Sequence, residues 1–152
     1  MILALALAIG VIAGLRAMMA PAAISWAAHL GHIDLSGTWL AFLGYRFTPW
    51  IFTVLAAVEL VTDQLPSTPS RKVPPQFGAR IVLGGLSGAA IGASGGALAT
   101  GAILGVVGAI IGTYGGAAAR ARLAAPFGRD LPAALIEDVV AIAGAYAIFS
   151  HL

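Results

Sequence analysis

The sequence predicts an all-α, polytopic membrane protein, and two observations lead to this prediction. Hydrophobic residues make up 60% of the 152 residues, charged residues only 9%, and the mean hydropathy is +0.97. A soluble domain carries roughly 25% charged residues, so this chain could not cover a globule of its size with a wettable surface. The apolar residues also gather in runs of roughly 20, the length that crosses a bilayer. We therefore expect one transmembrane domain over residues 1–152, surrounded mostly by lipid.

The first of about five expected transmembrane segments covers approximately residues 2–30, which is too long for one upright span of about 20 residues. Gly14, Arg16 and Pro21 interrupt it. The segment is either one tilted, kinked helix or two half-helices that meet near Gly14–Pro21. A break at membrane depth is tolerated only where protein or a cavity surrounds it.

The second segment, approximately residues 39–65, has Pro49 as its start or as a kink. Aromatic residues gather in its first part: Trp39, Tyr45, Phe47 and Trp50. They would form an interfacial belt on the outer side of the membrane, where amphipathic rings prefer to lie, or pack in the core.

The third and fourth segments, approximately residues 77–94 and 98–119, carry regularly spaced glycines. These are Gly84, Gly88, Gly92, Gly96, Gly101, Gly105, Gly108, Gly112 and Gly116. Such stripes flatten a helix face and let two backbones approach closely. Each glycine costs about 1 kcal/mol of helix propensity, so a close contact must offset it. We expect a glycine-zipper hairpin packed within the chain; the alternatives are a self-association surface or a thin-walled permeation path.

The fifth segment, approximately residues 132–152, follows a loop expected over residues 120–130. Asp130 is placed as the N-cap of its helix, with Pro132 in the first turn, where a missing N–H costs nothing.

Basic residues flank both ends of the expected hairpin: Arg71, Lys72, Arg80, Arg120, Arg122 and Arg129. The positive-inside rule makes that side cytoplasmic. Five spans then give a cytoplasmic N-terminus and an external C-terminus, with only Arg46 opposing the bias. The expected location is the inner membrane of a bacterium.

Charged residues inside the apolar segments are the candidate site. A carboxylate in hydrocarbon costs about 2.5–3.5 kcal/mol, so such residues usually face a partner, a cavity or a pathway. Glu59 and Asp63 lie four residues apart and share one helix face. Arg16 needs a carboxylate or the freed carbonyl groups of a helix break, and Glu59 is the expected partner. This group is either a static ion pair that fixes helix register or a protonatable, cation-binding pair of acids.

Glu137 and Arg80 complete the candidate site. Glu137 would face Arg80 or the basic loop, whereas Asp138 is expected to stabilise a helix start. Gly14-Leu15-Arg16 and Gly78-Ala79-Arg80 precede acidic spans. If the first segment is a broken hairpin, each half has three membrane segments, which is the pattern of an inverted repeat.

Several classes of function are disfavoured. Cysteine is absent and no serine lies in a Gly-x-Ser-x-Gly elbow. His29, His32 and Asp34 would make only a weak metal site, and solvated loop histidines are the better interpretation. The pI near 9.5 arises from few groups and implies no nucleic-acid partner. We expect no enzymatic activity, no metal and no cofactor.

Val58-Glu-Leu-Val-Thr-Asp-Gln-Leu-Pro66 resembles a motif of a family of small bacterial membrane proteins, domain of unknown function 4126. The residues that match this family in order are Gly14, Arg16, Glu59, Asp63, Pro66 and Arg80. Gln64 replaces the lysine usual in the family's motif. The resemblance implies membership of a membrane family and no particular activity.

Two functions remain open. The first is a small transporter or channel-like protein, expected to be a homo-oligomer, that moves a cation, a proton or a small solute past Glu59 and Asp63. The second is a structural or assembly subunit whose glycine-rich faces bind other membrane helices. A pathway predicts a pocket beside Glu59, whereas an assembly subunit predicts dry, fully paired charges.

Overall fold

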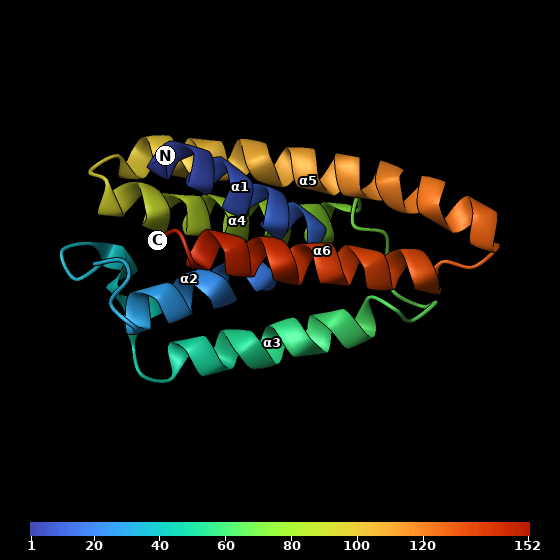
Figure 1. Cartoon of the computed structure of the whole chain (residues 1–152), viewed down its shortest axis with the longest axis horizontal. Helices are drawn as coiled ribbons and strands as arrows, with labels where there is room; N and C mark the ends of the chain where they lie inside the picture. The colour runs from blue at the N-terminus through green and yellow to red at the C-terminus, as the bar shows by residue number, and fades with distance from the viewer.

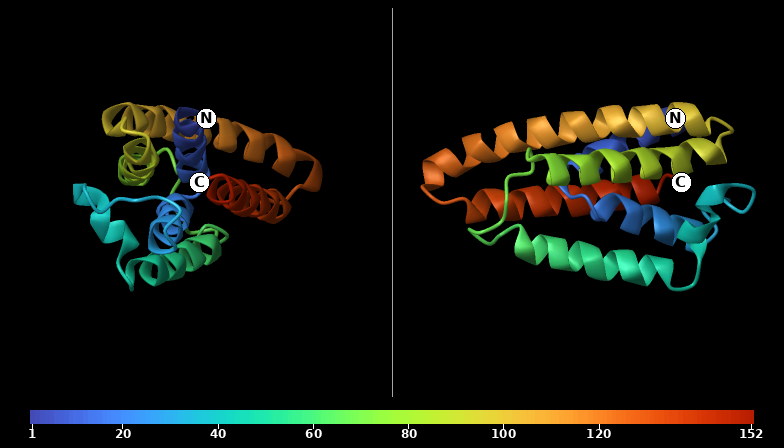
Figure 2. Two further views of the ribbon diagram at one scale, coloured as in Figure 1. Left: turned by 60° about the vertical axis from the view of Figure 1, so that its left-hand side comes forward. Right: turned by 180° about the vertical axis from the view of Figure 1, so that it is seen from behind.

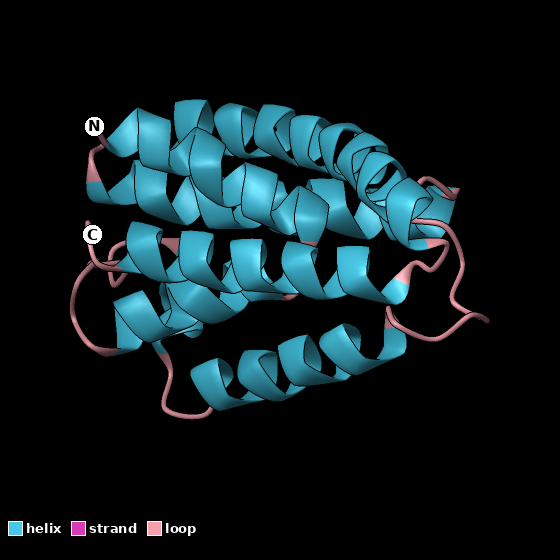
Figure 3. Cartoon of the chain, turned by 45° about the vertical axis from the view of Figure 1, so that its right-hand side comes forward, coloured by secondary structure: helices cyan, strands magenta, loops and turns pink.

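The structure, a computed structural model, describes all 152 residues as helices joined by turns and loops, without a strand (Figure 3). In chain order the elements are α1 (Ile2–Leu15), α2 (Met19–His29), the 3₁₀ helix η1 (Trp39–Gly44), α3 (Thr48–Thr62), α4 (Pro74–Ser94), α5 (Leu98–Phe127) and α6 (Leu131–Phe149). The all-α prediction is confirmed.

Three helices, α4, α5 and α6, are long and apolar enough to cross a membrane. The helices α1 and α3 are apolar but have only 14 and 15 residues. At 1.5 Å per residue they reach about 21–23 Å, less than the roughly 30 Å of a hydrocarbon core. The chain therefore has helices typical of a membrane protein, and three of them reach the length of a full span, whereas five spans were expected.

The α-helices lie along one long axis and alternate in direction (Figure 1 and Figure 2). Both termini and the loop before η1 lie at one end, which we call the terminal end. The connector between α3 and α4 and the turn between α5 and α6 lie at the other, which we call the basic end after Arg71, Lys72, Arg122 and Arg129. The axis of the bundle therefore separates the termini from most of the basic residues.

The first apolar segment consists of two helices and not of one kinked helix. Arg16 has an extended backbone (φ −138°, ψ 110°) and ends α1, and α2 then runs back toward the terminal end (Figure 1). Because the segment reverses, the N-terminus and the C-terminus lie at the same end. This corrects the expected topology, in which the termini lay on opposite sides. The N-terminus and the basic loops cannot both be cytoplasmic, because they lie at opposite ends of the bundle.

Two further boundaries differ from those expected. The second segment divides into η1 and α3, and α3 begins at Thr48 with Pro49 in its first turn. The helix α5 continues to Phe127, so most of the expected loop 120–130 is helical. Alanine, leucine and arginine dominate that stretch and are strong helix formers. The helix ends only at Gly128, whose φ of 62° few other residues adopt.

The helices α1, α4 and α5 pack against one another at glycines. A Cβ atom at Gly14 would lie 2.5 Å from the carbonyl oxygen of Ala109, and one at Gly88 would lie 2.7 Å from the Cα of Gly105. Both distances are shorter than van der Waals contact, so only glycine allows these backbones to approach so closely. Gly96 differs, because it lies in the turn between α4 and α5 with a φ of 72°.

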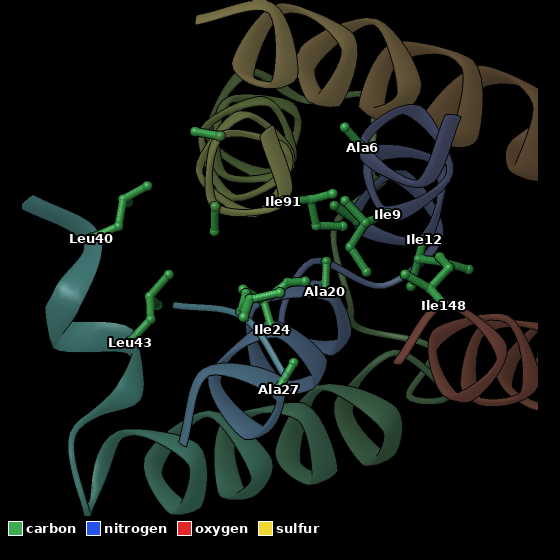
Figure 4. Packing of buried hydrophobic residues seen from close by; sticks show 14 of the residues in the cluster. Ala6, Ile9, Ile12, Ala20, Ile24, Ala27, Leu40, Leu43, Ile91 and Ile148 are labelled. Carbon is green, nitrogen blue, oxygen red and sulfur yellow. The ribbon is translucent and has the colours of Figure 1, made fainter. Parts of the chain in front are cut away.

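The apolar core lies between α1, α2 and α4, with contributions from η1 and α6. Figure 4 shows Ile9 of α1 beside Ile91 of α4, with Ile24 of α2 below them and Ile148 of α6 to one side. Leu40 and Leu43 of η1 are also fully buried. Close packing of these side chains fixes the relative positions of the elements, because helices in lipid associate through van der Waals contact.

The outward faces of α3, α5 and α6 are apolar and exposed, as lipid contact requires. Their large exposed side chains include Ile51, Val54, Val58, Val61, Ile103, Val107, Ile111, Val139, Val140 and Tyr146. The aromatic residues Trp39, Tyr45, Phe47 and Trp50 are exposed as well, at 59–67% of their surface. Core packing is therefore the wrong interpretation of these four rings, which lie in and beside η1 toward the terminal end.

Candidate functional site

A buried group of charged side chains lies toward the basic end, where α1 breaks and α3, α4, α5 and α6 converge. We call it the charged network; its members are Arg16, Glu59, Asp63, Arg71, Arg80, Arg120, Asp130, Glu137 and Asp138. It contains five of the six acidic residues of the chain. Such a concentration of charge in a chain that is 9% charged makes the network the strongest candidate site.

Arg16 is fully buried and joins two acidic helices. Its Nε donates to Asp138 Oδ1 at 2.7 Å, and its Nη1 donates to Asp63 Oδ2. The expected partner was Glu59, and this prediction is wrong. Asp63 caps the C-terminal end of α3, next to the α1–α2 break, and its carboxylate therefore reaches the guanidinium of Arg16.

Glu59 instead binds the free backbone N–H groups at the break. Its two carboxylate oxygens accept hydrogen bonds from the backbone N–H of Ala17 at 2.7 Å and of Met18 at 2.8 Å. The first N–H groups of a helix lack intrahelical partners, and a negative charge there also interacts favourably with the helix dipole. Glu59 therefore satisfies the start of α2.

Arg80 performs the complementary task at the end of α1. Its Nη1 donates to the carbonyl oxygens of Gly14 at 3.0 Å and Leu15 at 2.8 Å. Its Nη2 lies 3.7 Å from carboxylate oxygens of both Glu59 and Asp63. The side chain is 1% exposed. One guanidinium thus donates hydrogen bonds to the last carbonyl groups of α1 and adds a positive charge beside the two acids of α3.

Glu137 and Asp138 lie side by side in α6 and have different partners. Glu137 forms a two-pronged ion pair with Arg71 of the connector and lies 3.5 Å from Nη1 of Arg120. Asp138 binds Arg16 and accepts a hydrogen bond from Gln64 at 3.1 Å. Of the two partners expected for Glu137, the basic loop is found, through Arg120, and Arg80 is not.

Arg120 and Asp130 form the outermost pair of the network. Nε of Arg120 donates to Asp130 Oδ1 at 2.8 Å, and Nη2 donates to the other carboxylate oxygen. The hydrogen bonds from Arg120 hold the pKa of the Asp130 carboxyl below its ordinary value. Asp130 stands at the N-cap of α6, as expected, but its side chain caps no backbone N–H and binds Arg120 instead.

A polar cavity of about 360 Å³ opens beside the network. It is bounded by the connector, α4, α5 and the start of α6, and it touches Asp63, Arg71, Arg80, Arg120 and Asp130. Glu59 does not line it. The cavity expected beside Glu59 therefore lies one helical turn away, at Asp63, because the oxygens of Glu59 are turned to the backbone of the break.

The two Gly-x-Arg triplets do not occupy equivalent positions. Gly14-Leu15-Arg16 ends α1, whereas Gly78-Ala79-Arg80 lies in the first two turns of α4. The acids of α3 lie at its C-terminal end, whereas those of α6 lie near its N-terminal end. These residues therefore do not mark equivalent positions in the two halves, although α1–α3 and α4–α6 begin at opposite ends of the bundle, as an inverted repeat requires (Figure 1).

The sequence interpretation missed four members of the network. Asp138 was expected to stabilise a helix start and Asp130 to cap one, and Arg71 and Arg120 were assigned only to the basic flanks. The informative signal was charge balance, because four acids in apolar helices require several arginines within reach. The histidines lie elsewhere: His29 Nδ1 is 3.2 Å from the carbonyl oxygen of Gly44, and His32 packs against Phe149.

The comparisons with known proteins agree with the resemblance found in the sequence. Neither a curated protein nor a solved structure matches the chain. The model of one family, described as Domain of unknown function (DUF4126), matches residues 3–151, and the chain therefore belongs to that family.

Proposed function

We propose that the protein is a small membrane transport protein that passes a solute through the polar cavity and the charged network behind it. The observation that carries the proposal is the cavity of about 360 Å³ at the basic end, which reaches Asp63 and the buried Arg80. Both residues belong to the charged network. A solute in the cavity therefore meets groups whose charges also hold α1, α3 and α4 together.

The broken first segment supports this proposal. Backbone that is not helical at membrane depth is tolerated where it lines a cavity or is buried in protein, and many transporters place their sites at such breaks. Here the break at Arg16 requires both Glu59 and Arg80 to satisfy the freed backbone groups. An uninterrupted helix would need neither charge.

The ion pairs would act as a gate. Arg16 connects α3 with α6 through Asp63 and Asp138, so passage of a solute requires these pairs to exchange partners. Gln64 donates to the carboxylate of Asp138, and Arg120 donates to the backbone carbonyl of Asp63, so both lie beside the pairs that would exchange. The proposal is transport rather than catalysis, because the network consists of arginines and carboxylates paired with one another.

Flux through reconstituted protein tests the proposal. Liposomes containing the wild-type chain should show uptake of at least one small ion or solute above that of protein-free liposomes. Asp63→Asn should lower this flux at least tenfold, because it removes the carboxylate that links the cavity to Arg16. The matched control is Asp34→Asn in the exposed loop at the terminal end, which should transport like the wild type. Absence of flux for every inorganic cation, inorganic anion and proton gradient tested would reject transport.

One observation favours a second candidate, a structural or assembly subunit. Every buried carboxylate of the network has an arginine or backbone partner, as a static core requires. The glycine faces are already occupied by α1, α4 and α5, so partners would contact the exposed apolar faces of α3, α5 and α6. Cross-linking in native membranes would support this candidate if it captured stoichiometric complexes of a protein that carries no flux.

A further inference from the structure

The cavity at the basic end has the composition of an anion site. Three arginines and two hydroxyl side chains, Thr68 and Ser70, line it, against two carboxylates, Asp63 and Asp130. The lining charge is therefore +3 − 2 = +1 when all of these groups are ionised. The exposed Lys72, Arg122 and Arg129 add positive charge at the same end. Such a field raises the local concentration of anions.

The donors of this cavity are not all used. Arg80 is 1% exposed, and its Nε has no hydrogen-bond partner. A guanidinium has five N–H donors, and Arg80 makes only the two hydrogen bonds to the carbonyl groups of Gly14 and Leu15. A buried arginine donor without an acceptor is costly, and an oxyanion in the cavity that Arg80 lines would supply one.

The pair of Arg120 and Asp130 shows how an oxyanion fits. Both oxygens of Asp130 bind the guanidinium of Arg120 side by side, which is the geometry with which arginine also holds phosphate. The side chain of Asp130 is 60% exposed and stands on the short turn between α5 and α6, whereas that of Arg120 is 15% exposed. Asp130 can therefore leave with little rearrangement, while Arg120 stays in the wall.

We propose that this cavity binds a phosphate-type oxyanion, held by Arg120 and completed by Arg80 and the hydroxyl of Ser70, and that the ligand displaces Asp130. The inference deepens the proposed function, on which it rests for the use of the same cavity, by assigning the solute class as anionic. The same chemistry is presented by free phosphate and by the phosphate headgroup of an anionic lipid. Basic pockets between helices at the cytoplasmic surface suit either.

The test is calorimetric titration of inorganic phosphate into the full chain in nanodiscs of neutral phosphatidylcholine. Arg120→Gln should weaken phosphate binding at least tenfold. Asp130→Asn should tighten it several-fold, because it removes the competing carboxylate. The second variant changes an exposed loop residue and keeps the test decisive if the first fails to fold. Arg122→Gln is the matched control on α5; this residue is exposed and does not line the cavity, so its substitution should change the affinity less than twofold.

A second arm distinguishes the sources. Native mass spectrometry of nanodiscs that contain phosphatidic acid should detect bound lipid if the headgroup occupies the cavity. In that case Arg120→Gln should release the lipid, and added phosphate should displace it. Binding of either phosphate or the lipid with this dependence on Arg120 and Asp130 supports the inference. Binding of neither, or binding indifferent to both substitutions, overturns it. Flux without phosphate-type binding would reject the inference alone, whereas binding without flux would reject the transport proposal alone.

Discussion

At the scale of residues, the positions of Arg16 and Arg80 explain why the chain tolerates charge within apolar helices. Arg16 neutralises acids from α3 and α6, and Arg80 satisfies the carbonyl groups that the break in α1 leaves free. The sequence identified Arg16, Glu59 and Asp63 because charge in an apolar segment demands a partner. It could not identify which carboxylate pairs with Arg16, because the answer depends on how far α3 and α6 extend beside the break.

Removing Arg16 should destabilise the protein strongly. Arg16→Gln leaves Asp63 and Asp138 close together without the charge that joins them, and loss of one partner from a buried pair costs about 3–5 kcal/mol. We expect a much lower midpoint in thermal unfolding of the detergent-solubilised protein. Arg46→Gln, at an exposed arginine near the terminal end, is the control and should leave the midpoint unchanged. Equal midpoints for the two variants would contradict the assigned role of Arg16.

Asp130 should titrate below the ordinary aspartate pKa of about 3.9, because Arg120 donates hydrogen bonds to its ionised form. A lowered pKa in the folded state means that this pair adds stability at pH values above 3.9 and loses that contribution as the pH falls through the folded value. Carboxyl ¹³C NMR should show the pKa rising in Arg120→Gln and unchanged in Arg122→Gln. A wild-type Asp130 that titrates at or above the ordinary value would refute the pairing.

At the scale of elements, glycine spacing and the interruptions of the first segment carried most of the information. The glycine repeats indicated close helix contacts, and Gly14, Arg16 and Pro21 marked the place where the first segment breaks. The sequence left open whether that segment kinks or reverses, because the choice depends on Glu59 and Arg80 reaching the free ends of α1 and α2. The sequence interpretation also placed the end of α5 too early, because it assigned the basic residues to a loop although arginine favours helix.

Substitution of two glycines in α4 should have opposite effects. Gly88→Ala places a Cβ against the backbone of α5 and should destabilise the protein by about 1–3 kcal/mol, as overpacking does. Gly78→Ala meets no atom within 4 Å and should be neutral or stabilising by up to about 1 kcal/mol, the gain in helix propensity. Denaturant titration by circular dichroism measures both. Similar shifts in the two variants would show that the α4–α5 contact is not close.

At the scale of the whole molecule, the bundle separates its termini from its basic loops (Figure 1). Composition alone predicted the membrane class and the all-α fold. The orientation required the three-dimensional path, because a single reversal at Arg16 moves the N-terminus to the opposite end. Applied to this path, the positive-inside rule predicts a cytoplasmic basic end and external termini.

Single cysteines can test this orientation, because the chain has none of its own. In intact cells, Ser36→Cys at the terminal end should react with a membrane-impermeant maleimide. Ser70→Cys in the connector should react only after the membrane is permeabilised. Both positions are exposed in the folded chain, so folding does not hide either thiol. The reverse pattern would invert the orientation, and reaction of both from outside would contradict the separation of the two ends.

The polar, arginine-lined cavity is the central claim, and charge-selective modification at Ala117 tests it most directly. Ala117 lines the cavity, so Ala117→Cys should react in detergent-free nanodiscs with both anionic and cationic thiosulfonate reagents. The ratio of the anionic to the cationic reaction rate should be larger at Ala117→Cys than at the exposed Ser36→Cys. The reason is that Arg71, Arg80 and Arg120 attract the anionic reagent. Added phosphate should slow the reaction at Ala117→Cys only. A thiol at position 117 that neither reagent modifies, or that the cationic reagent modifies preferentially, would contradict the account.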